Sequence, residues 1–143
     1  MPEELKDRRT TAHDEVRFYM TQGITSISNK ATATEAAQTM FDTSQGAVLI
    51  EKDEKYIGIV TEGDVSQRVI AQIKKPIEVR VEAIMSQPII CVESNKLMAA
   101  TFLIMEEHGI RHIAVSEKNK IVGMLSIRDF STYYVRKFSK RTK

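Results

Sequence analysis

One seven-residue motif occurs twice and carries the residue types from which a binding site can be built. It reads Gly, two apolar residues, Thr or Ser, two variable residues and Asp, at Gly58–Asp64 and again at Gly123–Asp129. The hydroxyl can cap a helix that begins directly after it, and an acid three residues later is stabilised near the positive helix end. The same pair can instead bind a phosphate and a ribose diol. One copy favours capping, whereas the second copy makes ligand binding a competing interpretation.

Both copies of the motif belong to an internal repeat with a period of 65 residues. Shifted by that period, positions 20–65 align without a gap and give seven identities. The identical pairs are Met20 and Met85, Gln22 and Gln87, Ile24 and Ile89, Met40 and Met105, Lys55 and Lys120, Gly58 and Gly123, and Asp64 and Asp129. Apolar positions match as well, so the sequence predicts two copies of one unit of about 55 residues.

Each copy predicts the order strand, helix, strand, strand, helix. Strands are expected at 24–28, 47–51 and 56–61, and at 89–93, 112–116 and 121–126. The first helix of each copy is expected to follow Thr32, which has the capping-box spacing to Glu35, and Asn95. The second helix begins at the hydroxyl of the motif. Charged connections, Lys-Asp-Glu-Lys and Glu-Lys-Asn-Lys, predict tight hairpins.

One such unit has too little core to be stable alone. The sequence therefore predicts an α+β protein in which two β-α-β-β-α units pack sheet to sheet as a pseudo-twofold pair. The expected domains are an N-terminal segment or helix at 1–18, repeat 1 at 19–73, a linker at 74–83, repeat 2 at 84–138 and a basic tail at 139–143.

Composition excludes several classes of protein. The 143 residues include 21 Lys and Arg and 19 Asp and Glu, for a net charge of +2, and the last eight residues hold five basic groups and no acid. The longest charge-free stretch is twelve residues, whereas a membrane span needs about 20. The N-terminus has no secretory signal, and the single cysteine excludes an internal disulfide. A cytoplasmic protein with no membrane partner is expected.

No catalytic or metal site is expected from the reactive residue types. His13, His108 and His112 are scattered, and no cysteine or carboxylate completes a zinc-binding spacing. Cys91 lies in an apolar strand and is expected to be a small buried residue. The sequence therefore predicts neither an enzyme nor a catalytic cofactor.

Four segments together resemble the tandem CBS domain, named after cystathionine beta-synthase and also called the Bateman module. These segments are Ile24–Ile27, Gly58–Asp64, Gly109–Val115 and Gly123–Asp129, and the resemblance covers roughly 17–138. It implies a stand-alone regulatory module that binds an adenosine-containing ligand in the cleft between the repeats and signals to an unidentified effector protein. It also implies a homodimer formed through helices. The expected ligand is AMP, ADP or ATP, with S-adenosylmethionine less favoured.

The resemblance places a main cleft around the second copy of the motif. It implies that Asp129 binds the ribose hydroxyls, that Ser126 contacts phosphate or ribose, and that Arg128 faces the phosphates. Arg111 and His112 are expected to approach the same phosphates, although an exposed hairpin strand is the alternative role for both. The adenine is expected to lie against residues of the other repeat. These are Met20, Ile24 and Thr25, with Gln45 and Gly46 nearby.

A second cleft is expected around the first copy. Asp64 and Thr61 take the positions of the acid and the hydroxyl, with Met85, Ile89, Ile90 and Ile110 on the adenine side. Gly63, Gly46 and Ala47 replace the basic residues of the main cleft. Because Arg suits phosphate binding, a phosphorylated nucleotide is expected to prefer the cleft of Asp129.

One other function remains as an alternative. The chain can be a ligand-free dimerisation or scaffold protein with degenerate sites, in which the motif only caps helices. Nucleic-acid binding through the basic tail is not expected, because the rest of the chain is acidic and aromatic residues make up 6%.

Overall fold

The computed structural model describes residues 14–139, which form two compact units. The central unit is Ile24–Ile90, and the terminal unit combines 14–23 with 91–139. Each unit contains one sheet and its helices, so the predicted α+β class is confirmed. The expected N-terminal segment and basic tail fall largely on 1–13 and 140–143, which lie outside the described residues.

The central unit is a three-stranded sheet with helices against one face. Its elements are β2 (Ser26–Ser28), α2 (Ala33–Thr43), β3 (Ala47–Lys52), β4 (Lys55–Thr61), α3 (Glu62–Val65), the π-helical η3 (Ser66–Ile70), and the 3-10 turns η4 (Pro76–Glu78) and η5 (Val81–Ala83). Strand order is β2-β3-β4, with β2 parallel and β4 antiparallel to β3. The order of elements is the one predicted for a repeat.

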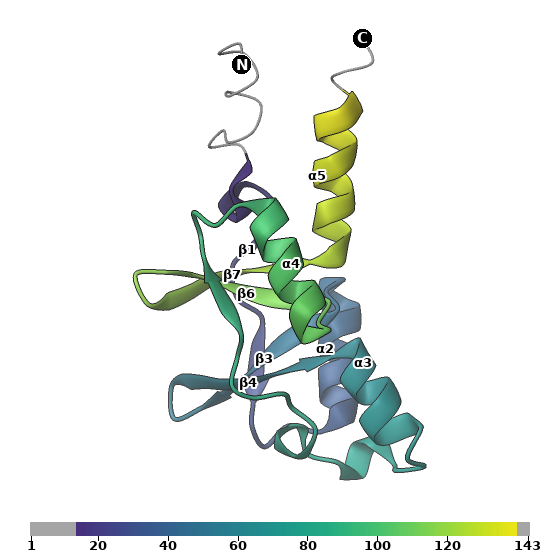
Figure 1. The fold of residues 1–143 in the computed structure, drawn as a ribbon. Helices are drawn as coiled ribbons and strands as arrows, with labels where there is room; N and C mark the ends of the chain where they lie inside the picture. Colours follow the sequence, from purple (N-terminus) through teal and green to yellow (C-terminus); the bar gives the residue numbers. More distant parts are fainter. Residues whose placement is uncertain (1–13, 140–143) are drawn as a thin grey trace, which may run out of the picture. The chain divides into compact units, whose positions relative to one another are not determined.

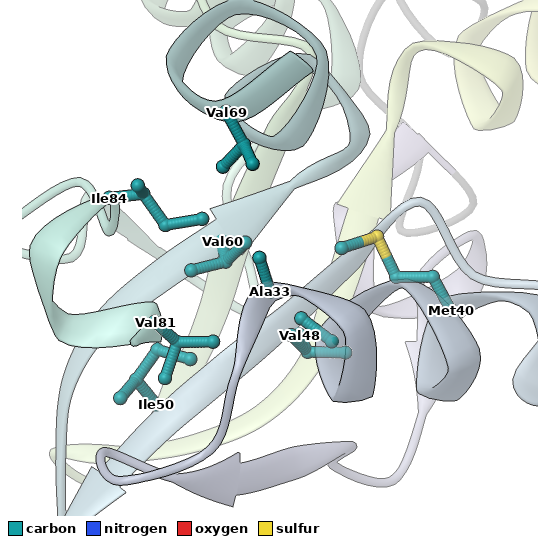
Figure 2. Close-up of a cluster of buried hydrophobic side chains, with 9 residues drawn as sticks. Ala33, Met40, Val48, Ile50, Val60, Val69, Val81 and Ile84 are labelled. Carbon is teal, nitrogen blue, oxygen red and sulfur yellow. The ribbon is translucent and has the colours of Figure 1, made fainter. Parts of the chain in front are cut away.

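Alternation along β3 and β4 places the core of the central unit on one face of its sheet. Val48 pairs with Val60 in the register of the two strands, and Figure 2 shows both beneath the helices. Ala33, Ala36 and Met40 of α2, Val69 of η3, and Val81 and Ile84 around η5 complete the buried cluster with Ile50. The segment predicted as a linker therefore contributes Val81 to a core.

The terminal unit repeats this arrangement and adds a strand. Its elements are η2 (Val16–Phe18), β1 (Thr21–Gln22), β5 (Cys91–Glu93), α4 (Met98–His108), β6 (His112–Glu117), β7 (Lys120–Ser126) and α5 (Ile127–Ser139). Strand order is β1-β7-β6-β5, and α5 leaves the end of β7 directly (Figure 1). Met105, Ile113 and Leu125 are buried here at the positions of Met40, Val48 and Val60.

The predicted hairpins are confirmed. Asp53 and Glu54 have φ of 50° and 64°, and Lys118 and Asn119 have φ of 52° and 64°. Positive φ at both central residues is the geometry of type I′ turns, whose twist matches that of the flanking strands. The two turns are therefore equivalent, and neither contains glycine.

One predicted helix cap is confirmed and one is wrong. Thr32 and Glu35 form the reciprocal capping box of α2. The cap expected at Asn95 is absent, because Leu97 occupies the N-cap position of α4 and no side chain caps this helix. The backbone of Leu97 is extended and pairs with Glu15 of the N-terminal segment, so the chain enters the helix two residues later than predicted.

No helix within 14–139 is long and apolar enough to cross a membrane.

Candidate functional site

Both copies of the motif place their acid at the start of a helix. The Ser126 backbone N–H and hydroxyl donate to Asp129 Oδ2, at 2.7 and 3.2 Å. The Thr61 backbone N–H and hydroxyl donate in the same way to Asp64 Oδ2, at 2.9 and 3.2 Å. The capping interpretation is confirmed for the first copy, where the Asp64 N–H also donates to the Thr61 hydroxyl. In the second copy, the bond from the Ser126 N–H to Asp129 is half of the same capping box. Capping does not exclude a ligand, because each cap uses one carboxylate oxygen.

The second carboxylate oxygen distinguishes the two acids. Asp64 Oδ1 lies 3.6 Å from Nε of Arg68, one turn further along the helix. Asp129 Oδ1 has no hydrogen-bond or ion-pair partner among the described residues, and Asp129 is only partly buried. A fixed carboxylate with one open oxygen can accept hydrogen bonds from a diol.

Arg111 and His112, both predicted to approach the phosphates, are connected to the start of α5 by backbone contacts. The N–H of Ile127 donates to Arg111 O at 3.0 Å, and His112 pairs with Ser126 across β6 and β7. Arg111 is exposed and makes no ion pair within the described part of the chain. Both the phosphate-binding role and the exposed-strand alternative are consistent with this placement.

The other basic residue expected near the phosphates, Arg128, is part of α5 itself. Arg128 lies in the first turn of α5, is exposed, and has no ion-pair partner among residues 14–139. In the central unit, the equivalent junction is closed by the N–H of Glu62, which donates to Gly46 O at 3.0 Å. Gly46 and Gly63 stand at the positions of Arg111 and Arg128, so this junction has no corresponding cation.

A methionine lies against the first glycine of each motif. A Cβ on Gly123 would lie 2.6 Å from Met20 Sδ, and one on Gly58 would lie 2.6 Å from Met85 Sδ. Real Cβ atoms do not approach other atoms this closely. The thioether could shift, but backbone oxygens are close as well, with Thr21 O at 2.7 Å from a Cβ on Gly123 and Ser86 O at 3.0 Å from one on Gly58. This contact was not predicted, although all four residues are among the seven identities of the repeat.

Strand pairing places Met20 in the compact unit that contains Asp129, and Met85 in the unit that contains Asp64. Thr21 pairs with Met124 in β1 and β7, which places the preceding residue, Met20, in the unit of Asp129. Ser86 pairs with Ile59 in an isolated bridge, at the equivalent positions of the central unit. Met85 therefore belongs to the unit that contains Asp64.

The other residues expected to contact adenine are divided between the two units. Ile24, Thr25, Gln45 and Gly46, expected near Asp129, belong to the central unit, as do Ile89 and Ile90. Ile110, expected near Asp64, belongs to the terminal unit. Their contribution to binding stays a prediction.

A polar cluster fixes the N-terminal segment to α5 one turn beyond Asp129. The hydroxyl of Tyr133 and the ammonium of Lys137 both donate to Asp14 Oδ1, and Asp14 is only 7% exposed. Burial and the hydrogen bond to Asp14 raise the pKa of Tyr133. Burial lowers the pKa of Lys137, but the hydrogen bonds with Tyr133 and Asp14 outweigh burial and raise it. The cluster was not predicted from the sequence.

The sole cysteine is exposed, so its predicted burial is wrong. Cys91 lies in β5, which is at the edge of its sheet. Partial desolvation and the nearby Glu93 carboxylate raise the pKa of its thiol, which disfavours the nucleophilic thiolate. Among residues 14–139, no group of three or more His, Cys, Asp or Glu side chains is arranged to hold a metal ion.

Comparison with known proteins gives two matches to one family model. The model described as the CBS domain matches 15–71 and 81–136. An uncharacterized protein of Methanopyrus kandleri is 40% identical over 101 residues, which cover 68% of this chain and 51% of that protein. The chain thus spans about half the length of this curated relative.

Solved structures show the same fold. A putative signal-transduction protein with CBS domains from Burkholderia ambifaria matches with a TM-score of 0.77 and 28% identity, covering 80% of this chain and 85% of that one. A hexameric CBS-CP12 protein from bloom-forming cyanobacteria matches with a TM-score of 0.76 and 25% identity, covering 82% and 69%.

Proposed function

The chain belongs to the CBS-domain family, and from this premise we propose that it is a regulatory module that binds an adenine nucleotide of the AMP, ADP or ATP class. Tandem CBS modules are generally regulatory and ligand-binding. The proposed nucleotide-binding residues in the terminal unit are Asp129, Ser126, Arg111, Arg128 and Met20. Occupancy of this site would be passed to an effector protein.

The open oxygen of Asp129 is the observation that carries the proposal. Ser126 holds Oδ2 with two hydrogen bonds and thereby fixes the direction of Oδ1. A ribose offers two hydroxyl donors, and a carboxylate can accept both. Hydrogen bonds to a charged acceptor are worth about 1.5–3 kcal/mol, so one such acid can decide whether a nucleoside binds.

The charges around Asp129 favour a phosphorylated ligand. Arg128 follows the first residue of α5, and the backbone of Arg111 is bonded to that first residue. Helix N-termini attract anions, and guanidinium groups bind phosphate oxygens with two parallel hydrogen bonds. Met20, directly before β1, supplies an adaptable apolar side chain suited to a base. We therefore expect AMP to bind more tightly than adenosine.

Isothermal titration calorimetry with AMP tests the proposal. The wild-type chain is expected to bind AMP, and Asp129→Asn is expected to weaken binding at least tenfold because the neutral amide is a poorer acceptor for the diol. Glu107→Gln removes one acid from the exposed surface of α4 and is the matched control, with unchanged affinity. Equal affinity of wild type and Asp129→Asn would contradict the assignment. A parallel titration with S-adenosylmethionine checks the less favoured ligand.

We also propose that the module forms a homodimer through its helices. Val135 and Phe138 of α5 are 64% and 51% exposed, and their equivalents Ile70 and Ile73 are 57% and 94% exposed. Apolar side chains exposed at the same two positions of both repeats indicate a contact surface. The hexameric state of the CBS-CP12 protein is a precedent for self-association in a relative. If the chain dimerises but binds no nucleotide, the scaffold alternative is correct.

Signalling to an effector requires that nucleotide changes the affinity of the module for that protein. A ligand shifts an equilibrium only by its differential affinity for the two states. Affinity capture of bound proteins from a lysate, with and without AMP, tests this step. A set of proteins that does not respond to AMP would contradict the proposed signalling.

A further inference from the structure

The two equivalent acids have different neighbours one turn along their helices. Asp64 is followed at that position by Arg68, and Asp129 is followed by Tyr133. The guanidinium of Arg68 turns back to Asp64, with Nε 3.6 Å from Oδ1. The hydroxyl of Tyr133 instead donates to Asp14. Only the acid of the central unit has a cation from its own helix.

Arg68 is fixed at a second point as well. Its Nη1 donates to Ile84 O at 3.1 Å and lies 3.5 Å from Met85 O. Ile84 is buried in the core of the central unit. Met85 is the residue whose thioether lies against Gly58. The guanidinium thus connects the acid to the segment that carries the predicted adenine contact.

These contacts leave neither oxygen of Asp64 without a neighbour. Oδ2 accepts two hydrogen bonds from Thr61, and Oδ1 faces Nε of Arg68 at 3.6 Å, an ion pair without a hydrogen bond. An isolated exposed ion pair is weak, and the Arg68 side chain is 51% exposed, but hydrogen bonds from the same planar group to two backbone carbonyls hold it beside the acid. A ribose diol that approaches Oδ1 would compete with this guanidinium.

Arg68 is also poorly placed to compensate by binding phosphate. Two of its nitrogen atoms already face protein acceptors. Gly63 and Gly46, which replace the basic residues of the terminal unit, add no other cation. The contacts of Arg68 with Asp64, Ile84 and Met85 therefore leave only its Nη2 available for a phosphate.

We infer that Arg68 withholds Asp64 from ligands, so that Asp129 is the acid that binds nucleotide and each chain binds one. This inference rests on the proposed function. It assigns Arg68 as the residue that makes the two repeats unequal. The two sites then differ for two reasons. Arg68 pairs with Asp64, and glycines 46 and 63 replace the basic residues that are expected to bind phosphate in the terminal unit.

Calorimetry in an Asp129→Asn background tests the role of Arg68, with adenosine and AMP as probes. Adding Arg68→Met keeps the aliphatic stem but removes every donor, and we expect adenosine to bind at least tenfold more tightly than to Asp129→Asn alone. Adding Asp64→Asn as a third change is expected to abolish the gain. Arg80→Met removes an exposed arginine from the same unit and is the matched control, with no gain. Arg68→Gln gives a second variant if the methionine destabilises the fold.

The outcomes separate the two proposals. If wild type binds AMP through Asp129 but neither Arg68 variant gains affinity, the inference is wrong and the proposed function stands. If the Arg68 variants lose affinity, Arg68 is itself a ligand contact and the inference is again wrong. If wild type binds neither AMP nor adenosine, the proposed function fails and the inference fails with it.

Discussion

Met20 lies against Gly123 so closely that a Cβ on the glycine would be 2.6 Å from the methionine sulfur. The same relation holds between Met85 and Gly58 in the central unit. The glycine of the repeated motif therefore serves the approach of a second segment and not a turn. Met20 is the residue of that segment that is expected to contact adenine. The glycine therefore contributes both to fold stability and to the proposed binding.

Gly123→Ala is expected to destabilise the fold by about 1–3 kcal/mol, because overpacking displaces Met20 and the backbone of Thr21. It should also weaken AMP binding. Chemical denaturation and calorimetry measure the two effects. Gly63→Ala is the control, since its Cβ would meet the nearest atom at 3.6 Å and alanine favours the helix, so unchanged or higher stability is expected. Equal loss of stability in both variants would contradict the role of the close contact.

Replacing both guanidinium groups of the terminal site is expected to change ligand preference. In Arg111→Met with Arg128→Met, AMP affinity should fall at least tenfold while adenosine affinity stays nearly constant, because only AMP carries a phosphate to pair with them. The ratio of the two affinities is the measurement. A variant with Lys74→Met and Lys75→Met has the same change in net charge and serves as the control. An unchanged ratio would show that these arginines belong only to an exposed strand.

Val135→Lys is expected to reduce self-association, because it places a charge on the apolar surface of α5. Analytical ultracentrifugation over a range of concentrations measures the change, which should be a tenfold or greater rise in the dimer dissociation constant. Asn95→Lys adds the same charge at an exposed position outside the helices and is expected to leave association intact. The same loss in both variants would indicate a nonspecific effect of charge.

The Asp14 cluster predicts a loss of stability in alkali. The pKa values of Tyr133 and Lys137 are raised in the folded chain. Their contribution is therefore complete below the pKa values of the unfolded chain, about 10, and is lost as the pH rises through the higher folded values. Chemical denaturation between pH 8 and 11 should show a shallower alkaline decline in Tyr133→Phe than in wild type. Identical slopes would contradict the coupling.

Tyr133→Phe is also expected to lower stability at neutral pH by about 1–3 kcal/mol, because the buried carboxylate of Asp14 loses a donor. Thr132→Ala alters an exposed neighbour on α5 and is the control. A neutral result for Tyr133→Phe would show that the other contacts of Asp14 satisfy its carboxylate without the Tyr133 hydroxyl.

Local pattern was sufficient to predict most elements. The six main strands, the hairpins and the cap at Thr32 follow from short apolar runs, charged connections and spacing over a few residues. Two predictions were wrong. The N-cap of α4 is Leu97 and not Asn95, at the position that Thr32 occupies in the other repeat. Cys91 is exposed because it and the buried Val92 point to opposite faces of β5, and which face is buried depends on the distant segments packed against the strand.

The sequence by itself determined the duplicated unit, its order of elements and the paired hydroxyl and acid that start a helix in each copy, because these depend on residues a few positions apart. Only the tertiary structure decided that Met20 joins the unit of Asp129, that Arg68 reaches Ile84, and that Tyr133 turns to Asp14. The pairing of β1 with β7 and the contacts of Tyr133 with Asp14 join residues about 100 or more positions apart. Such contacts depend on which segments the chain brings together, and no short pattern specifies them.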